Sequence, residues 1–199
     1  MKKRIFVAIK IPEEIKKELF SFQEKFKELN PVESRKAGAT RSIFNGVNIN
    51  WTKIENFHFT ILFVGLVEEQ EKEKIKEILK NVSEKSSKFY LELNKLVLGP
   101  FKEKPRMIWA TGPLNEKIVN LRKDIVNAFL GNKIYFEDRH EFKTHITLAR
   151  ARGNELWGRK LDENLDLIIP VKEIFLMESE LKSEGVEYKI IEKFKLKRS

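Results

Sequence analysis

The chain has 199 residues, of which 41% are hydrophobic and 15 are phenylalanine, a composition that can bury a substantial core and excludes an intrinsically disordered protein. Its 39 Lys and Arg outnumber its 30 Asp and Glu, and the net charge of +9 favours a polyanionic partner such as RNA or a phosphorylated ligand, although a lysine-rich surface without such a partner explains the charge equally well. No cysteine occurs, which excludes disulfides and thiolate metal sites and leads us to expect a cytoplasmic protein.

The first quarter of the chain predicts a strand and a helix. Residues 3–11 alternate Ile and Val with other side chains, which is typical of a strand, and they run into Pro12 without the small-residue cleavage site of a signal peptide. Residues 13–29 carry apolar side chains every three or four positions, which predicts a helix with one face on a sheet. The basic segment 31–47 predicts a long loop, which could close over a polyanion or could be a solvated insertion.

The rest of the chain predicts further strands and two more amphipathic helices, over residues 67–85 and 114–131. The predicted strands span residues 47–52, 57–64, 89–98 with a break near 94–95, 106–111, 144–149, 165–177 and 186–196. No apolar run reaches the roughly 20 residues of a membrane span, and no linker rich in Pro, Gly or Ser divides the chain, so we expect one domain over residues 1–199 and no membrane partner. The order of elements lacks the alternation of a doubly wound parallel sheet, and it predicts an α+β fold with largely antiparallel sheets and helices on their outer faces.

Two of the predicted strands carry nearly the same unit. Because side chains alternate along a strand, His58 and Thr60 share one face of the first strand, and His145 and Thr147 share one face of the second. The side chains expected to pack on the opposite face of the first strand are Phe57, Phe59, Ile61 and Phe63. A histidine on a strand is usually an ordinary polar residue, but here two of the chain's three histidines head a His-x-Thr unit. This recurrence predicts two similar lobes whose imidazoles and hydroxyls converge across a cleft.

Such a set of side chains is suited to acid–base cleavage of a phosphodiester. Histidine has an unperturbed pKa of about 6.5, so near neutral pH one imidazole can take a proton from water while the other gives a proton to the departing oxygen. A positioned acid or base is worth roughly 10²- to 10⁴-fold in rate. The threonine hydroxyls can donate to the non-bridging phosphate oxygens, where a hydrogen bond to a charged group is worth about 1.5–3 kcal/mol. The residues alone do not decide which histidine is the acid.

The doubled unit, His58-Phe59-Thr60-Ile61 and His145-Ile146-Thr147-Leu148, resembles the two HxTx motifs of the 2H phosphoesterases. The flanking segments narrow the resemblance to the RNA 2′,3′-cyclic phosphodiesterase branch, also called 2′-5′ RNA ligase or LigT-like. The segments that resemble this branch are residues 4–9, Trp51 with 55–58, 106–110, 145–150 and 178–181. The resemblance covers nearly the whole chain, and the basic loop is the departure that bears on substrate preference.

The resemblance implies a bilobal fold, with two pseudo-symmetric sheets facing across a central cleft, and an enzyme that needs no metal or cofactor. The implied reaction is hydrolysis of the 2′,3′-cyclic phosphate at an RNA end to a 2′-phosphate, with 2′-5′ RNA ligation as the reverse reaction. His58 is then the general acid toward the leaving 3′ oxygen and His145 the general base toward water, while Thr60 and Thr147 bind the phosphate. The implied partners are RNA ends, including tRNA fragments, or nucleotides, and the protein is expected to be a monomer.

Arg150 is a substrate-binding candidate whose position the pattern leaves open. By simple alternation it faces away from His145, unless the strand bulges or ends before it. The resemblance, in contrast, implies an arginine near the phosphate. Phe6 and Trp51 could stack on a base or pack in the core. His140, which has no threonine partner, is expected at the surface or behind a residue of the site.

Three other interpretations fit parts of the sequence. His58, His140 and His145 could bind a metal ion, although their spacing is not a usual zinc pattern and leaves the threonines unexplained; activity that survives EDTA would decide against a metal site. A basic fold with aromatic side chains could bind RNA ends without turnover, and unchanged cleavage by His58→Ala and His145→Ala variants would rule out the catalytic interpretation. Within the superfamily, the substrate could instead be 2′-5′ oligoadenylate, a cyclic phosphate of ADP-ribose or an RNA 3′ end.

Overall fold

The computed structural model describes residues 2–28, 49–137, 141–182 and 185–197. The predicted basic loop 31–47 and His140 lie outside the described residues. The helices are α1 (Glu13–Glu28), the short 3₁₀ helix η1 (Ile54–Asn56), α2 (Glu69–Ser83) and α3 (Glu116–Gly131). The strands are β1 (Lys3–Lys10), β2 (Ile49–Trp51), β3 (His58–Val67), β4 (Phe89–Gly99), β5 (Met107–Thr111), β6 (His145–Ala151), β7 (Asp162–Val171), β8 (Glu173–Lys182) and β9 (Gly185–Lys195).

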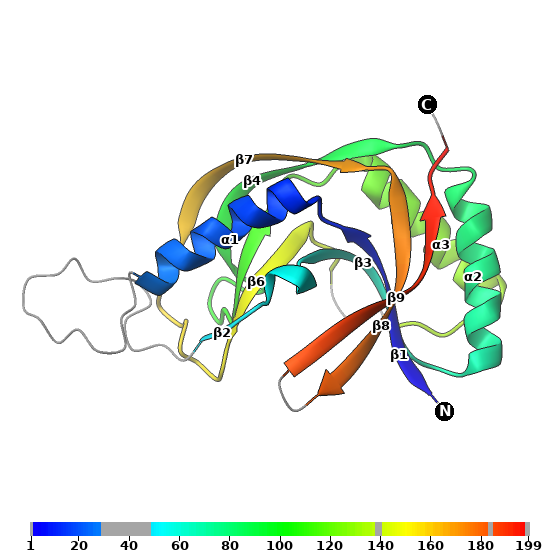
Figure 1. Ribbon diagram of the computed structural model, residues 1–199, viewed down its shortest axis with the longest axis horizontal. Helices are drawn as coiled ribbons and strands as arrows, with labels where there is room; N and C mark the ends of the chain where they lie inside the picture. The colour runs from blue at the N-terminus through cyan, green and yellow to red at the C-terminus, as the bar shows by residue number, and fades with distance from the viewer. Residues whose placement is uncertain (1, 29–48, 138–140, 183–184, 198–199) are drawn as a thin grey trace, which may run out of the picture.

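The strands follow one hydrogen-bonded path in the order β7-β4-β5-β6-β3-β1-β8-β9, with β2 added to β6, and every pairing between these strands is antiparallel. At the centre of the path, β3 and β6 meet through a single residue pair, Phe59 and Ile146. The two expected sheets are therefore joined along the two histidine strands, with four strands of the path on each side. The predicted α+β fold with largely antiparallel strands is confirmed (Figure 1).

The helices are amphipathic and divide between the two halves. Figure 1 shows α2 and α3 together beside β9, and they bury the apolar stripes that the sequence predicts, which in α3 consists of Ile118, Leu121, Ile125 and Phe129. The first helix, α1, lies over the other half, where Gln23 donates a hydrogen bond to the carbonyl of Leu148 in β6. None of the helices in the described ranges is long and apolar enough to cross a membrane.

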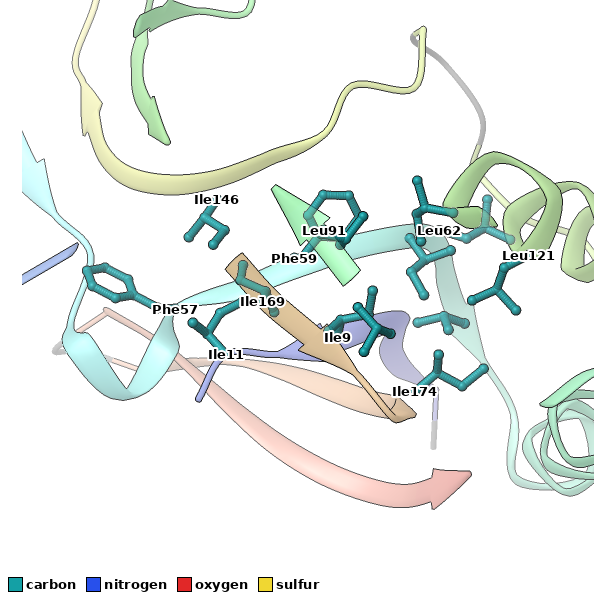
Figure 2. Close-up of a cluster of buried hydrophobic side chains, with 14 of the residues drawn as sticks. Ile9, Ile11, Phe57, Phe59, Leu62, Leu91, Leu121, Ile146, Ile169 and Ile174 are labelled. Carbon is teal, nitrogen blue, oxygen red and sulfur yellow. The ribbon is translucent and has the colours of Figure 1, made fainter. Parts of the chain in front are cut away.

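The main core lies between the helices and the strands and is continuous across both halves. Side chains from β1, β3, β4, β6, β7, β8 and α3 meet in the cluster that Figure 2 shows, where Phe59 of β3 and Ile146 of β6 are both fully buried at the junction. A second, smaller cluster of Phe6, Ala8 and Met177 lies apart from this core. Phe6 and Ala8 alternate with the core residues Ile5, Val7 and Ile9, so β1 buries both of its faces.

A bulge interrupts each histidine strand at the same position of the repeated unit. In the pairing of β1 with β3, Val7 lies opposite Leu62 and Ala8 opposite Thr60, so Ile61 is the extra residue. In the pairing of β5 with β6, Ile108 lies opposite Ala149 and Trp109 opposite Thr147, so the extra residue is Leu148. Both extra residues come three positions after the histidine. An extra residue reverses which face the following side chains occupy, so the fifth residue after each histidine returns to the face of the histidine.

Candidate active site

A pocket of about 130 Å³ contains all five candidate site residues, at the junction of the two halves. Its walls are formed by Arg4, Phe6, Thr52, Asn56, His58, Thr60, Phe63, His145, Thr147, Arg150, Ser179 and Tyr188. The described residues of the lining include two arginines and two histidines but no carboxylate, so the pocket is suited to an anion.

The two histidines are held in the same way. His58 Nδ1 lies 2.7 Å from the carbonyl oxygen of Asn56, and His145 Nδ1 lies 2.8 Å from that of Lys143, so each imidazole donates to the backbone two residues before it. In a neutral imidazole the other nitrogen, Nε2, is then the unprotonated one, which can accept a proton. His58 Nε2 lies 3.1 Å from Thr60 Oγ1, which places imidazole and hydroxyl against the same point of the pocket.

The bulges decide which other side chains enter the pocket. Arg150 is exposed and lines the pocket with His145 and Thr147, because the extra residue Leu148 brings it back to their face. Phe63, at the equivalent position of β3, is 52% exposed and also lines the pocket. The prediction that Phe63 packs with Phe57 was therefore wrong, because it assumed an unbroken alternation along the strand.

Hydrogen bonds from α1 and the chain before η1 support the bulge in β6. The carbonyl oxygen of Leu148 accepts from Gln23 Nε2 at 2.6 Å and from the backbone N–H of Thr52 at 2.9 Å. The carbonyl thus has two donors, one that continues the pairing of β2 with β6, in which Trp51 lies opposite Ala149, and one from α1. Gln23 is fully buried and supplies one of them, which ties the position of Arg150 to the first helix.

Aromatic rings pack against both imidazoles. The ring of His58 lies 5.0 Å from that of Phe6 and 4.7 Å from that of Tyr188, measured between centroids. His145 stacks on Trp109 with 4.1 Å between centroids and 26° between planes. Neither Trp109 nor Tyr188 was predicted as a site residue: the segment 106–110 contributed only to the family resemblance, and nothing in the sequence around Tyr188 places it beside His58. Phe6, which could have stacked on a base, is 2% exposed and packs under His58; Trp51 lies outside the pocket lining.

Burial and nearby cations keep both imidazoles neutral in the unliganded pocket. The pKa of His58 is lowered to about 4, chiefly by burial; the charges of Arg150 and His145 act in the same direction, and the hydrogen bond to Asn56 acts against them. Burial also lowers the pKa of His145, and Arg150 acts on it in the same direction. A bound anion would offset these cations and raise both pKa values, so the pocket can protonate an imidazole when a phosphate arrives.

The described residues contain no group of three His, Cys, Asp or Glu side chains that could hold a metal ion. Of the histidines in the metal interpretation, His140 lies outside the described residues. His58 and His145 both use Nδ1 for a backbone carbonyl, which leaves one nitrogen of each ring for chemistry in the pocket.

Comparisons with known proteins agree with this architecture. A family model described as LigT like Phosphoesterase matches residues 31–109. The chain is 29% identical, over 198 residues, to the RNA 2′,3′-cyclic phosphodiesterase of Methanocaldococcus jannaschii, an alignment that covers 96% of this chain and 99% of that protein. It is 28% identical to the Thermotoga maritima protein of the same name, over 94% of this chain and 92% of that one. A solved protein of Thermus thermophilus has the same fold, with a TM-score of 0.76 and 25% identity over 98% of this chain and 99% of that chain.

Proposed function

Since the chain belongs to the LigT-like phosphoesterase family, we propose that it is an RNA 2′,3′-cyclic phosphodiesterase, which opens the cyclic phosphate at an RNA end to leave a 2′-phosphate. The observation that best supports this proposal is the matched pair of imidazoles, each of which donates through Nδ1 to the carbonyl two residues before it, in one pocket with Arg150. Relatives that carry this enzyme's name align with nearly the full chain.

In the proposed reaction, His145 acts as the general base and His58 as the general acid. Nε2 of His145 takes a proton from a water molecule, whose oxygen attacks the phosphorus. The bond between phosphorus and the 3′ oxygen breaks, and Nε2–H of His58 gives its proton to that oxygen. The products are a 2′-phosphomonoester and a 3′-hydroxyl, and proton exchange with solvent restores both imidazoles. The family resemblance assigns which histidine has which role, since their backbone anchors are equivalent.

Thr60, Thr147 and Arg150 are proposed to bind the phosphate. All three line the pocket with the histidines, and the hydroxyls and guanidinium can donate to the non-bridging oxygens as charge builds up in the transition state. Arginine offers two parallel N–H donors to a phosphate and is always protonated, so Arg150 also supplies the charge that would raise the population of bound substrate.

The remaining parts of the proposal concern the setting of the reaction. We infer that the whole chain of 199 residues acts as one bilobal domain and as a monomer, without a metal ion or cofactor. RNA ends, including tRNA fragments, are the proposed substrates, and 2′-5′ RNA ligation is the reverse reaction. The absence of cysteine supports a cytoplasmic setting.

The test is hydrolysis of a nucleoside 2′,3′-cyclic phosphate by protein that has been stripped of metal and kept in EDTA. We expect a 2′-phosphate as the sole phosphomonoester, identified by chromatography against both isomers. A 3′-phosphate product would refute the proposed leaving group while leaving two-histidine chemistry in place. Loss of activity in EDTA that returns with added metal would refute metal independence.

A further inference from the structure

Arg4 lines the same pocket as the histidines but is separated from them by the rings of Phe6 and Phe63. It comes two residues before Phe6 on β1. The pairing of β1 with β3 has two bulges, and both extra residues belong to β3, so the side chains along β1 alternate regularly between its two faces. Arg4 and Phe6 therefore share the pocket face, and both line the pocket. The neighbouring strand β8 places Ser179 directly opposite Arg4, and Ser179 lines the pocket too.

The pairing register gives the order of groups along this wall. Lys10 of β1 lies opposite His58, Phe6 lies opposite Phe63, and Arg4 lies opposite Leu66. With a rise of roughly 3.4 Å per residue, the Cα atom of Arg4 is about 7 Å beyond that of Phe6, in the direction away from His58. The rings of Phe6 and Phe63 have centroids 6.2 Å apart. The wall thus runs from the histidines across an aromatic surface to an arginine.

The guanidinium of Arg4 has no ion-pair partner among the described residues, in contrast to the cations on the other face of these strands. On that face, Lys3 pairs with Glu178 at 2.9 Å and Lys189 pairs with Glu180 at 2.6 Å. A charge on a protein surface is readily paired where both signs are available. Since no carboxylate is among the described residues that line the pocket, Arg4 is available to an anionic ligand.

Arg4 and Arg150 occupy different parts of the pocket. The charge of Arg150 lowers the pKa of both His58 and His145, whereas no such effect of Arg4 on either imidazole is found. This agrees with the pairing register, which places Arg4 beyond Phe6 on the side away from His58, whereas Arg150 lies on the same strand as His145. A ligand that uses both arginines needs two anionic groups separated by a body that can lie against the exposed ring of Phe63.

An RNA end meets this requirement. Its last nucleotide carries the cyclic phosphate on the 2′ and 3′ oxygens and a phosphodiester on the 5′ oxygen, with the ribose between them and the base to one side. We propose that Arg4 and Ser179 form a second anion subsite, which binds the phosphodiester on the 5′ side of the terminal nucleotide. This inference rests on the proposed function, and it makes the enzyme selective for ends of an RNA chain, or for nucleotides phosphorylated at the 5′ position, over simple nucleoside cyclic phosphates.

The experiment compares two substrates that differ only at the 5′ oxygen: adenosine 2′,3′-cyclic phosphate with a 5′-hydroxyl, and the same compound with a 5′-phosphate. The quantity of interest is the ratio of their kcat/KM values, 5′-phosphate over 5′-hydroxyl. A charge-assisted contact predicts a ratio of about ten or more for the parent protein. We expect Arg4→Met to bring the ratio close to one, Arg4→Lys to give an intermediate ratio, and Ser179→Ala to lower it less than Arg4→Met.

Lys123→Met is the control, because Lys123 is exposed on α3, lies outside the pocket lining and loses the same charge; its ratio should equal that of the parent. A parent ratio near one would overturn the inference. A parent ratio that persists in Arg4→Met would also overturn it. If both kcat/KM values fell together, Arg4 would contact the reacting phosphate; if neither fell, Arg4 would contact no part of the substrate.

Binding measurements separate this inference from the proposed function. If the parent hydrolyses neither compound, the proposed function fails, and the same comparison is made by calorimetry with adenosine 2′-phosphate and adenosine 2′,5′-bisphosphate. A tighter Kd for the bisphosphate that is lost in Arg4→Met supports the subsite even then. Equal affinities of the parent for the two nucleotides contradict it. A preference for the bisphosphate that remains in Arg4→Met also contradicts it, provided that the circular dichroism of the variant matches that of the parent.

Discussion

The indole of Trp109 stacks on the imidazole of His145, with 4.1 Å between ring centroids and 26° between ring planes. The indole itself is confined by Gly99, since a Cβ atom at residue 99 would lie 2.4 Å from Cε3 of Trp109. An aromatic face also attracts a cation, so the stacked indole favours the imidazolium that forms when His145 accepts a proton. A glycine on β4 thus controls the position of a ring on β6 through a tryptophan on β5.

The first prediction concerns Gly99. In a Gly99→Ala variant the added methyl group must displace the indole of Trp109, which removes the support of His145. We expect kcat to fall about tenfold while KM changes by less, because the substrate contacts stay in place. Gly131→Ala is the matched control, since a Cβ atom there meets nothing within 4 Å. Parent-like kcat in Gly99→Ala would show that the stacking does not position His145.

Arg150 gives a prediction with two readouts. Arg150→Met should raise the KM for a cyclic phosphate about tenfold or more, because a charged hydrogen-bond donor to the phosphate is lost. It should also move the pH profile of kcat/KM to higher pH, because the charge of Arg150 lowers the pKa of both His58 and His145. If Arg150 only stabilised the fold, the pH profile of kcat/KM in the folded fraction of Arg150→Met would equal that of the parent.

Gln23 offers a test of the bulge. Gln23→Met removes one of the two hydrogen bonds to the Leu148 carbonyl, so the bulge should relax and Arg150 should lose its fixed position. We expect a KM several-fold higher and an unfolding free energy lower by about 1 kcal/mol. Lys17→Met, on the exposed side of the same helix, is the control. If Gln23→Met lost stability but kept the KM of the parent, the bulge would not depend on α1.

The pH dependence follows from the lowered pKa values of His58 and His145. Because kcat/KM reports the free enzyme, both limbs of its bell-shaped profile should lie below the ordinary histidine pKa of 6.5, with the lower limb near pH 4. The free energy of unfolding should also depend on pH through these histidines. His58 has a lower pKa folded, about 4, than unfolded, so its contribution is present above pH 6.5 and is lost as pH falls toward 4.

Rate profiles and thermal unfolding check these two statements separately. A His58→Gln variant should lose less Tm than the parent between pH 7 and pH 4, because it lacks the group that takes up the proton on unfolding. A basic limb of kcat/KM above pH 7 would contradict the account of the free pocket.

Many of the helices and strands could be predicted from the sequence, because each depends on the periodicity of its own residues. The stripe of Ile118, Leu121, Ile125 and Phe129 predicted α3, and alternation in the repeated unit predicted that His58 and Thr60 share a face. These patterns need only the geometry of a single helix or strand.

What the sequence could not provide depends on pairing between strands. The bulges at Ile61 and Leu148 are visible only against the partners in β1 and β5, and they decide that Phe63 and Arg150 line the pocket. Residues 4–9 carried part of the family resemblance, but only the pairing of β1 with β3 and β8 shows that Arg4 lies in the pocket beside Ser179. For the same reason, the meeting of the two halves through β3 and β6 was not foreseen.

The most direct test of the central claim is the rate at which the parent, His58→Ala and His145→Ala proteins hydrolyse a cyclic-phosphate-ended oligonucleotide in EDTA. The account predicts that each substitution lowers kcat by roughly 10²- to 10⁴-fold while the protein stays folded by circular dichroism. It also predicts that the double variant is little slower than either single variant, because the two groups act in one step. Folded single variants that cleave as fast as the parent would contradict the two-histidine mechanism.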